Sequence, residues 1–278
     1  MKLIADSGST KTHWVLLNGS EETHCSTVGL NPLLVDEPFF LKEVESACRM
    51  LPCEAERVGE VFFYGAGCGT ENACQRVDEW LGRYFRFARR EVHGDMLGAC
   101  RAVCGSGVGM VGILGTGSNM CYYNGSVIAK QRVSTGFILG DEGSGNNIGK
   151  RLLKDYLEER MPQELRIMFH DTYPFSTAEF LDRIYRQPYA NRFLASLVSF
   201  ASLHRDEVYI KEVLKDCFSA FFKQVGYFGE EGCLPLRLVG GIVASFGDEL
   251  AEAAMSCGVE LGEMTASPIA GLIRFHMS

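Results

Sequence analysis

The sequence predicts an α/β fold made of two similar domains, and three features of the chain lead to this prediction. Two apolar strands joined by a turn of glycine and hydroxyl residues occur over residues 3–17 and again over residues 111–123. After each hairpin, the same order of strands and helices follows. Glycines 105, 107 and 109 lie between the two halves and supply conformational freedom to the connection.

Short apolar runs predict the strands of the first half, and longer amphipathic runs predict its helices. The expected strands cover residues 2–5, 13–17, 22–28, 58–64 and 87–92. The expected helices cover residues 36–51, 71–85 and 95–104. This half therefore runs as three strands, helix, strand, helix, strand, helix.

The second half repeats that order, with a longer helical insertion after its third strand. The expected strands cover residues 108–114, 119–123, 126–133, 236–239 and 259–261. The expected helices fill the block 143–229 and cover residues 245–256 and 269–276. We therefore expect one domain over residues 1–107 and a second over 108–278, each a mixed sheet with helices on both faces. A single large sheet with a glycine-rich turn is the alternative.

Composition and charge exclude several classes of protein. The net charge of −8, from 27 basic and 35 acidic side chains, argues against binding to nucleic acid or to an anionic membrane surface. No apolar stretch approaches the ~20 residues that span a bilayer, and Asp6 interrupts the region where a signal peptide would need apolar residues. The eleven cysteines contain no C-x-x-C pair, so we expect reduced thiols and a cytoplasmic protein.

The first hairpin combines a carboxylate with a turn whose backbone N–H groups are unencumbered. Asp6 ends the first strand, and the turn consists of Gly8, Ser9 and Thr10. Such N–H groups can surround a terminal phosphate, and a carboxylate at this place can hold a hydrated Mg²⁺. The hairpin thus predicts a site for ATP and Mg²⁺, with an ordinary hairpin as the alternative and a phosphate contact of Lys11 left open.

A second phosphate loop is predicted in the second hairpin, at Gly115, Thr116 and Gly117. Two such loops facing one another would clamp a polyphosphate. Farther along the chain, Gly240 and Gly241 form a turn from strand to helix, where glycine lets the backbone lie against adenine or ribose. Ser245 is expected at the start of the following helix, as its cap and as a contact to the nucleotide.

The motifs together resemble a known family. Gly140-Asp141-Glu142-Gly143-Ser144, the loop from Gly115 to Asn119, and Asp95 are similar to N-acetylglucosamine kinase and its bacterial relatives among the BadF/BadG-type ATPases. These belong to the actin-like ATPase and sugar kinase superfamily, and the resemblance covers essentially the whole chain. It implies two RNase H-like domains with an active-site cleft between them, which closes on ATP.

The resemblance also implies roles for individual residues. Asp95 matches the general base, Thr10 matches an ATP contact, and Asn31 and Asp141 match contacts to the sugar. On spacing alone, each aspartate could instead be a helix N-cap, and Asn31 could belong to a turn before Pro32. Weaker sugar-binding candidates are Ser118, Asn119 and Gly136.

The function that the resemblance implies is that of an ATP-dependent amino-sugar kinase, which forms the 6-phosphate of N-acetylglucosamine. The stretch 134–139 differs from the Gly-Gly-Trp-Gly loop of the animal kinase, so N-acetylmuramic acid or glucosamine stays open as the substrate. A homodimer also stays open.

Two functions outside sugar phosphorylation are also considered. One is an activator-type ATPase that drives a partner enzyme and carries an iron–sulfur cluster between subunits. Cys121 lies near the expected cluster position, but residues 140–143 stand where the second cysteine would be. The other is a nucleotide-dependent scaffold or sensor, against which the presence of Asp6, Asp95 and Thr116 argues.

Overall fold

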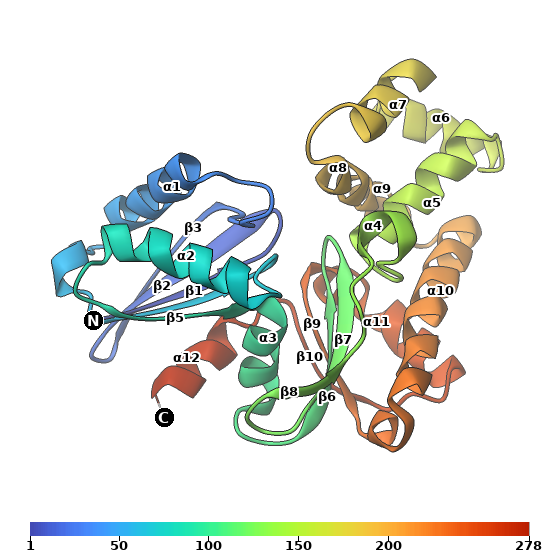
Figure 1. Cartoon of the computed structure of the whole chain (residues 1–278). Coiled ribbons are helices and arrows are strands. Elements are labelled where there is room, and N and C mark those ends of the chain that lie inside the picture. The colour runs from blue at the N-terminus through green and yellow to red at the C-terminus, as the bar shows by residue number, and fades with distance from the viewer. Residues whose placement is uncertain (278) are drawn as a thin grey trace. The chain divides into compact units, whose positions relative to one another are not determined.

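A computed structural model describes residues 1–277, which divide into two compact units (Figure 1). The first unit comprises Met1–Val108, Asn124–Ile128 and the C-terminal segment from Ser267. The second comprises Gly109–Tyr123 and Ala129–Ala266. Within residues 1–277, no helix has the length and apolar character needed to span a membrane.

The first unit is built on a mixed five-stranded sheet in the order β3-β2-β1-β4-β5. Its strands are β1 (Lys2–Ser7), β2 (Lys11–Asn18), β3 (Glu21–Val28), β4 (Glu60–Gly65) and β5 (Arg89–Gly94). Strand β2 is antiparallel to both of its neighbours, β1 and β3, whereas β1, β4 and β5 run parallel to one another. The carboxyl ends of β1, β4 and β5 therefore meet at one edge of this sheet.

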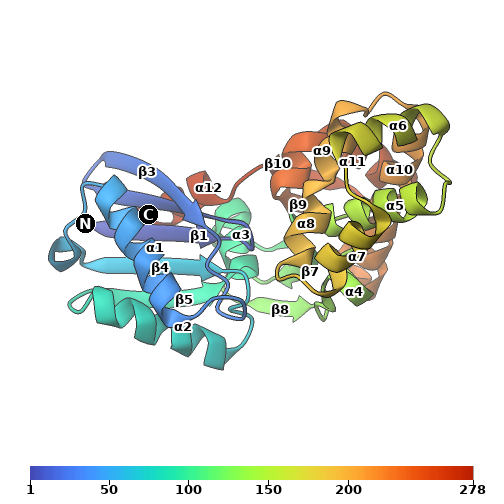
Figure 2. The same ribbon diagram turned by 90° about the horizontal axis from the view of Figure 1, so that it is seen from above.

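Helices cover both faces of this sheet (Figures 1 and 2). Helices α1 (Glu37–Met50) and α2 (Glu71–Tyr84) pack on one face, and α3 (Asp95–Cys104) and α12 (Ile269–Met277) pack on the other, while the short η1 (Ala55–Arg57) precedes β4. The side chains of Asp36 and Thr70 accept the backbone N–H groups of Phe39 and Ala73, and so cap α1 and α2. Alternation along β1 sends Leu3 and Ala5 into the α1/α2 core.

The second sheet has the order β10-β9-β6-β7-β8, and it repeats the first. Its strands are β6 (Gly109–Leu114), β7 (Ser118–Tyr123), β8 (Ile128–Gln131), β9 (Leu236–Val239) and β10 (Leu261–Thr265). As in the first sheet, the opening strand is antiparallel to the second strand and parallel to the fourth. The prediction of an α/β protein with two mixed sheets flanked by helices is thus confirmed.

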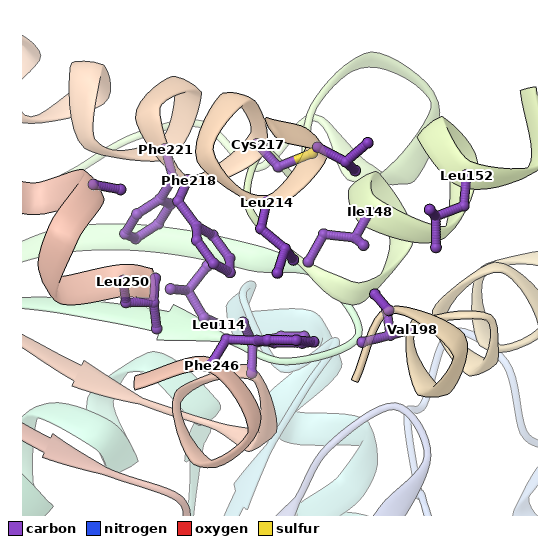
Figure 3. Packing of buried hydrophobic residues seen from close by; sticks show 14 of the residues in the cluster. Leu114, Ile148, Leu152, Val198, Leu214, Cys217, Phe218, Phe221, Phe246 and Leu250 are labelled. Atoms are coloured by element: carbon purple, nitrogen blue, oxygen red, sulfur yellow. The ribbon is translucent and has the colours of Figure 1, made fainter. Parts of the chain in front are cut away.

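The helical insertion and the last helix of the second unit enclose its core. The helices are α4 (Gly136–Leu139), α5 (Gly145–Leu157), α6 (Gln163–Thr172), α7 (Thr177–Tyr185), α8 (Ala190–Ser196), α9 (Val198–Leu203), α10 (Val208–Phe222), η2 (Lys223–Cys233) and α11 (Gly241–Ser256). Figure 3 shows Ile148 of α5, Phe218 of α10 and Phe246 of α11 packed together, and all three are fully buried. This core fixes the start of α5 relative to β6.

Several boundaries differ from the predicted ones. The segment from Ser267, predicted in the second domain, packs with the first unit: α12 lies so close to α3 that a Cβ at Gly271 would stand 2.2 Å from the Ala102 carbonyl oxygen. Helix α11 begins at Gly241 instead of residue 245. Strand β10 covers Leu261–Thr265 instead of 259–261, because its pairing with β9 extends to Val239.

His276 anchors the end of α12 to the first sheet. Its ring stacks on Phe62 with 3.7 Å between ring centroids, and its Nε2 lies 2.8 Å from the Tyr64 hydroxyl. Burial lowers the pKa of His276 to about 4, and the positive charges of Arg101 and Lys2 and the nearby His93 act in the same direction. His276 is therefore neutral in the folded protein at neutral pH.

Acidification is expected to destabilise the protein through His276. The unfolded chain binds a proton at this ring near pH 6.5, but the folded chain binds it only near pH 4, so stability falls as the pH falls between these values. Between pH 7 and 5 this contributes about 1 kcal/mol, because solvent screens part of the effect at a partly exposed ring. Chemical denaturation of wild type and His276→Gln at both pH values measures this contribution. The variant should lose about 1 kcal/mol less, and equal losses would contradict the assignment.

Candidate functional site

The turn between β1 and β2 is held in a fixed conformation. Ser7 pairs with Thr12 across the hairpin, and their buried hydroxyl oxygens lie 2.8 Å apart. The Gly8 N–H donates to the Lys11 carbonyl oxygen at 2.9 Å and closes the turn. The residues predicted to bind phosphate at this turn are Gly8, Ser9 and Thr10. Their backbone is thus preorganised at the carboxyl end of β1.

Asp6 lies beside this turn, in an environment that disfavours its charge. Successive side chains of a strand point to opposite faces, so Asp6 faces away from the α1/α2 core, on the face that α3 covers. Burial raises the pKa of Asp6 to about 7, and the neighbouring negative charge of Asp95 adds to the rise. The two carboxylates therefore interact electrostatically.

Asp95 is the first residue of α3 and follows β5 directly. Its Oδ1 accepts the N–H of Met96 at 2.9 Å, while the N-cap position of the helix belongs to Gly94. Burial raises the pKa of Asp95, although backbone hydrogen bonds oppose the rise. The N-cap alternative for Asp95 is therefore wrong, because Asp95 is already the first residue of the helix. Its carboxylate belongs to the edge of the sheet where β1, β4 and β5 end.

These two carboxylates fit a hard divalent cation. Mg²⁺ binds carboxylate oxygens and keeps several waters. Neither Asp6 nor Asp95 forms a salt bridge with a basic side chain within residues 1–277. Two partly buried carboxylates without a cationic partner repel one another when both are ionised, and a divalent cation would remove that repulsion.

Asn31 is fixed after β3 by its own turn. Its Oδ1 accepts the Leu33 N–H at 2.9 Å, and its carbonyl oxygen accepts the N–H groups of Leu34 and Val35. The predicted turn around Pro32 is thus present. Asn31 is 9% exposed, and its side chain lies against Gly67 of the turn after β4.

The second predicted phosphate loop connects β6 and β7. The Gly115 N–H donates to the Gly117 carbonyl oxygen at 2.9 Å. The carbonyl oxygens of Gly115 and Thr116 accept the N–H groups of Gly145 and Asn146 at 2.8 and 3.0 Å. The first turn of α5 is therefore bonded to this loop.

The side chain of Asp141 also stabilises this loop through hydrogen bonds. Its Oδ1 accepts the Ser118 N–H at 3.3 Å, and its Oδ2 accepts from Asn146 Nδ2 at 3.0 Å. A Cβ at Gly117 would stand 2.9 Å from Asp141 Oδ2. The N-cap alternative for Asp141 is wrong, because Ser144 caps α5. Burial raises the pKa of Asp141, and its φ of 61° is unusual for a residue with a side chain.

The weaker candidates lie close by in the same unit. Asn119 is on β7, opposite Ile113, and its Oδ1 accepts the Met120 N–H at 2.8 Å. The Ser118 hydroxyl donates to the Glu142 carbonyl oxygen at 2.8 Å. Gly136 begins α4 with a φ of 69°, a conformation that favours glycine.

The turn between β9 and α11 approaches the second phosphate loop. Gly240 has a φ of 135°, and a Cβ there would stand 2.2 Å from the Leu114 carbonyl oxygen. Gly241 follows as the first residue of α11. Ser245 was expected to cap the helix, but it lies in the second turn and its hydroxyl donates to the Gly241 carbonyl oxygen at 3.2 Å. This expectation is wrong because the helix begins four residues earlier.

The predicted residues fall into two groups, one in each unit. The first unit holds Asp6, Gly8, Ser9, Thr10, Asn31 and Asp95. The second unit holds Gly115, Thr116, Gly117, Ser118, Asn119, Gly136, Asp141, Gly240, Gly241 and Ser245. Sequence reasoning missed Gly29, Gly67 and Asn146, which contact predicted residues directly. The glycines at 65, 67 and 69, which follow a strand, could have pointed to a tight turn beside the site.

Neither a family model nor a curated protein matches the chain, but solved structures do. A protein from Porphyromonas gingivalis, described as a candidate N-acetylglucosamine kinase, is 34% identical, with a TM-score of 0.93 over 99% of this chain and 98% of that one. A candidate N-acetylglucosamine kinase from Chromobacterium violaceum is 20% identical, with a TM-score of 0.75 over 99% and 98%.

A more distant structure shares the fold. A ROK family glucokinase from Streptomyces griseus, in complex with glucose and AMPPNP, is 14% identical, with a TM-score of 0.54 over 98% of this chain and 97% of that one. At 34% identity over nearly the whole length of both chains, the Porphyromonas structure is a true relative. The chain therefore belongs to the N-acetylglucosamine kinase family of the actin-like ATPase and sugar kinase superfamily.

Proposed function

We propose that this sugar kinase transfers the γ-phosphoryl group of ATP to the 6-hydroxyl of N-acetylglucosamine. The observation that carries the proposal is the pair Asp6 and Asp95, two partly buried carboxylates with raised pKa values at the carboxyl ends of β1 and β5. Phosphoryl transfer needs positioning, charge neutralisation and a proton acceptor. The first unit offers a candidate residue for each of these tasks.

Asp95 is the proposed proton acceptor. As the sugar hydroxyl attacks the γ-phosphate, its proton moves to the Asp95 carboxylate, and ADP leaves. A carboxylate whose pKa is raised by burial is a stronger base than an exposed one. The hydrogen bond from the Met96 N–H to Oδ1 holds the carboxylate in one orientation, which leaves Oδ2 for the hydroxyl.

Asp6 is the proposed carboxylate that holds Mg²⁺ through water. When bound, Mg²⁺ would neutralise charge on the phosphate oxygens. The residues proposed to bind ATP are Gly8, Ser9, Thr10, Gly115, Thr116, Gly117, Gly240, Gly241 and Ser245. They offer backbone N–H groups and hydroxyls as ligands for the phosphates and the nucleoside. ATP binding is consistent with the AMPPNP bound to the glucokinase that shares this fold.

For the sugar, we propose contacts from the residues that the family resemblance indicates. The residues are Asn31, Asp95, Ser118, Asn119, Gly136 and Asp141. Amide and carboxylate groups suit neighbouring hydroxyls because they accept and donate hydrogen bonds in pairs. The alternative is a kinase of N-acetylmuramic acid or of glucosamine, because residues 134–139 differ from the Gly-Gly-Trp-Gly loop of the animal N-acetylglucosamine kinase. We place the reaction in the cytoplasm, where the eleven free cysteines stay reduced.

A coupled assay of ADP release tests the proposed substrate. The purified protein is given ATP, Mg²⁺ and, in turn, N-acetylglucosamine, N-acetylmuramic acid, N-acetylmannosamine, glucosamine and glucose. We expect the highest kcat/KM with N-acetylglucosamine and far slower ATP hydrolysis without sugar, because water is a poorly positioned acceptor. Equal rates with and without every sugar would contradict a kinase function.

Replacing Gly240 by alanine is expected to raise the KM for ATP about tenfold. The new Cβ would collide with the Leu114 carbonyl oxygen, so that either the second phosphate loop or the start of α11 must shift. Gly258→Ala is the matched control, because Gly258 also has a positive φ of 68° but nothing lies within 4 Å of the place that a Cβ would take there. Steady-state kinetics measure the KM for ATP in both variants. An unchanged KM for ATP in Gly240→Ala would exclude the turn from ATP binding.

A further inference from the structure

Residues 29–31 lie between two turns of the first unit. At one end, the Gly29 N–H donates to the Thr10 carbonyl oxygen at 2.9 Å. A Cβ at Gly29 would stand 2.4 Å from the Gly8 carbonyl oxygen, so the phosphate turn lies directly against it. At the other end, Asn31 lies against Gly67, in the turn between β4 and α2.

The contact between Gly67 and Asn31 leaves no room for a side chain at residue 67. A Cβ at Gly67 would stand 2.1 Å from Asn31 Oδ1 and 2.7 Å from its Cγ. Gly67 also has a φ of 85°, which residues with a side chain rarely adopt. Asn31 can keep its observed position only because residue 67 is glycine.

The hydrogen bonds of Asn31 define which group it can offer to a ligand. Its Oδ1 accepts the Leu33 N–H, which assigns the orientation of the amide. Within residues 1–277, the Asn31 Nδ2 has no hydrogen-bond partner. The side chain thus presents two N–H donors in a fixed direction, and these suit a hydroxyl or carbonyl oxygen of a sugar.

The turn that holds Asn31 is itself fixed to the strands that carry the carboxylates. The Ala66 N–H donates to the Ser7 carbonyl oxygen at 2.7 Å, next to Asp6. The Cys68 carbonyl oxygen would stand 3.1 Å from a Cβ at Gly94, the residue before Asp95. A displacement at residue 67 therefore acts on Asn31 first, while Ala66 stays hydrogen-bonded to β1 and Cys68 stays close to Gly94 at the end of β5.

We propose that Gly67 is a positioning residue for the acceptor sugar, which acts by holding the Asn31 amide in its binding orientation. This inference rests on the proposed function, because it assigns Asn31 to the sugar. Gly67 does not touch the substrate. Its replacement should weaken sugar binding and leave the binding of ATP unchanged.

The experiment compares three alanine variants by steady-state kinetics with N-acetylglucosamine and ATP. Gly67→Ala introduces both the collision with Asn31 and an unfavourable φ. Gly19→Ala introduces only the unfavourable φ of 64°, and Gly69→Ala introduces neither, since nothing lies within 4 Å of a Cβ at either position. We expect the sugar KM to rise about tenfold in Gly67→Ala alone, the size of one lost hydrogen bond to substrate. The ATP KM should stay within about twofold in all three.

A double-mutant cycle separates positioning from a general structural effect. Asn31→Ser removes the amide and shortens the side chain, and should raise the sugar KM by itself. If Gly67 acts through Asn31, adding Gly67→Ala to Asn31→Ser raises the sugar KM no further. Additive effects of the two substitutions on the sugar KM would overturn the proposal, as would an unchanged sugar KM in Gly67→Ala.

The same variants distinguish a folding defect from a failure of the proposed function. If Gly67→Ala alone fails to fold, the combination with Asn31→Ser should fold again, because the shorter side chain makes room, and a combination that stays unfolded overturns the proposal. If the wild type phosphorylates none of the amino sugars, the proposed function itself fails. If the wild type is active and the sugar KM of Gly67→Ala is unchanged, only the positioning role is contradicted.

Discussion

Asparagine in place of Asp95 is expected to lower kcat at least about 10²-fold and to leave the KM for ATP close to that of the wild type. Asparagine has the shape of aspartate, and its Oδ1 can still accept the Met96 N–H that now bonds at 2.9 Å. What the variant loses is the basic oxygen for the proton of the attacking hydroxyl. The measurement is steady-state ADP release at saturating N-acetylglucosamine and ATP.

The matched control for this substitution is Asp36→Asn. Asp36 caps α1 through the Phe39 N–H, and asparagine is an equally good N-cap, so neither stability nor activity should change. If Asp95→Asn retains near-normal turnover, Asp95 has no part in the proton transfer. An equal loss of ATP affinity in Asp95→Asn would indicate instead that the residue supports nucleotide binding.

The second large effect is expected for Asp6→Asn, and it has two opposite parts. Activity should fall at least about 10²-fold, because a neutral amide is a poor ligand for hydrated Mg²⁺. Stability of the metal-free protein should rise. The pKa of Asp6 is raised from 3.8 to about 7, so at high pH the ionised carboxylate destabilises the folded protein by about 4 kcal/mol. Asparagine removes this cost but is itself desolvated, so we expect a gain of about 2 kcal/mol.

Chemical denaturation at pH 8 in the presence of a chelator measures this gain, and kinetic assays over a range of Mg²⁺ concentrations measure the loss. Wild type should gain stability when Mg²⁺ and ATP are added, and Asp6→Asn should gain less. A variant that is both less stable and fully active would show that Asp6 is a structural carboxylate.

Much of the fold could be predicted because the relevant signals are local. Apolar runs broken by glycine-rich turns placed the strands of both hairpins, and their recurrence predicted two sheets of the same plan. The proximity of Asp6 and Asp95 also follows from a simple rule. Both lie at the carboxyl ends of parallel strands in one sheet, so their side chains meet at the same edge.

Other features depend on contacts between residues far apart in the chain. The place of α12 in the first unit results from close packing on α3, which no periodicity along the sequence reports. Gly29 and Gly67 are needed because the backbone or side chain of another segment occupies the space of a Cβ. Asp141 holds a left-handed conformation through its bonds to Ser118 and Asn146. Such constraints become visible only in three dimensions.

The chemical nature of the product tests the proposed phosphoryl transfer most directly. Wild-type protein is incubated with ATP, Mg²⁺ and N-acetylglucosamine, and the mixture is followed by phosphorus and carbon NMR. We expect a phosphomonoester coupled to carbon 6 of the sugar, formed in equal amount to ADP and strongly reduced in Asp95→Asn. Inorganic phosphate as the sole product beside ADP would contradict it.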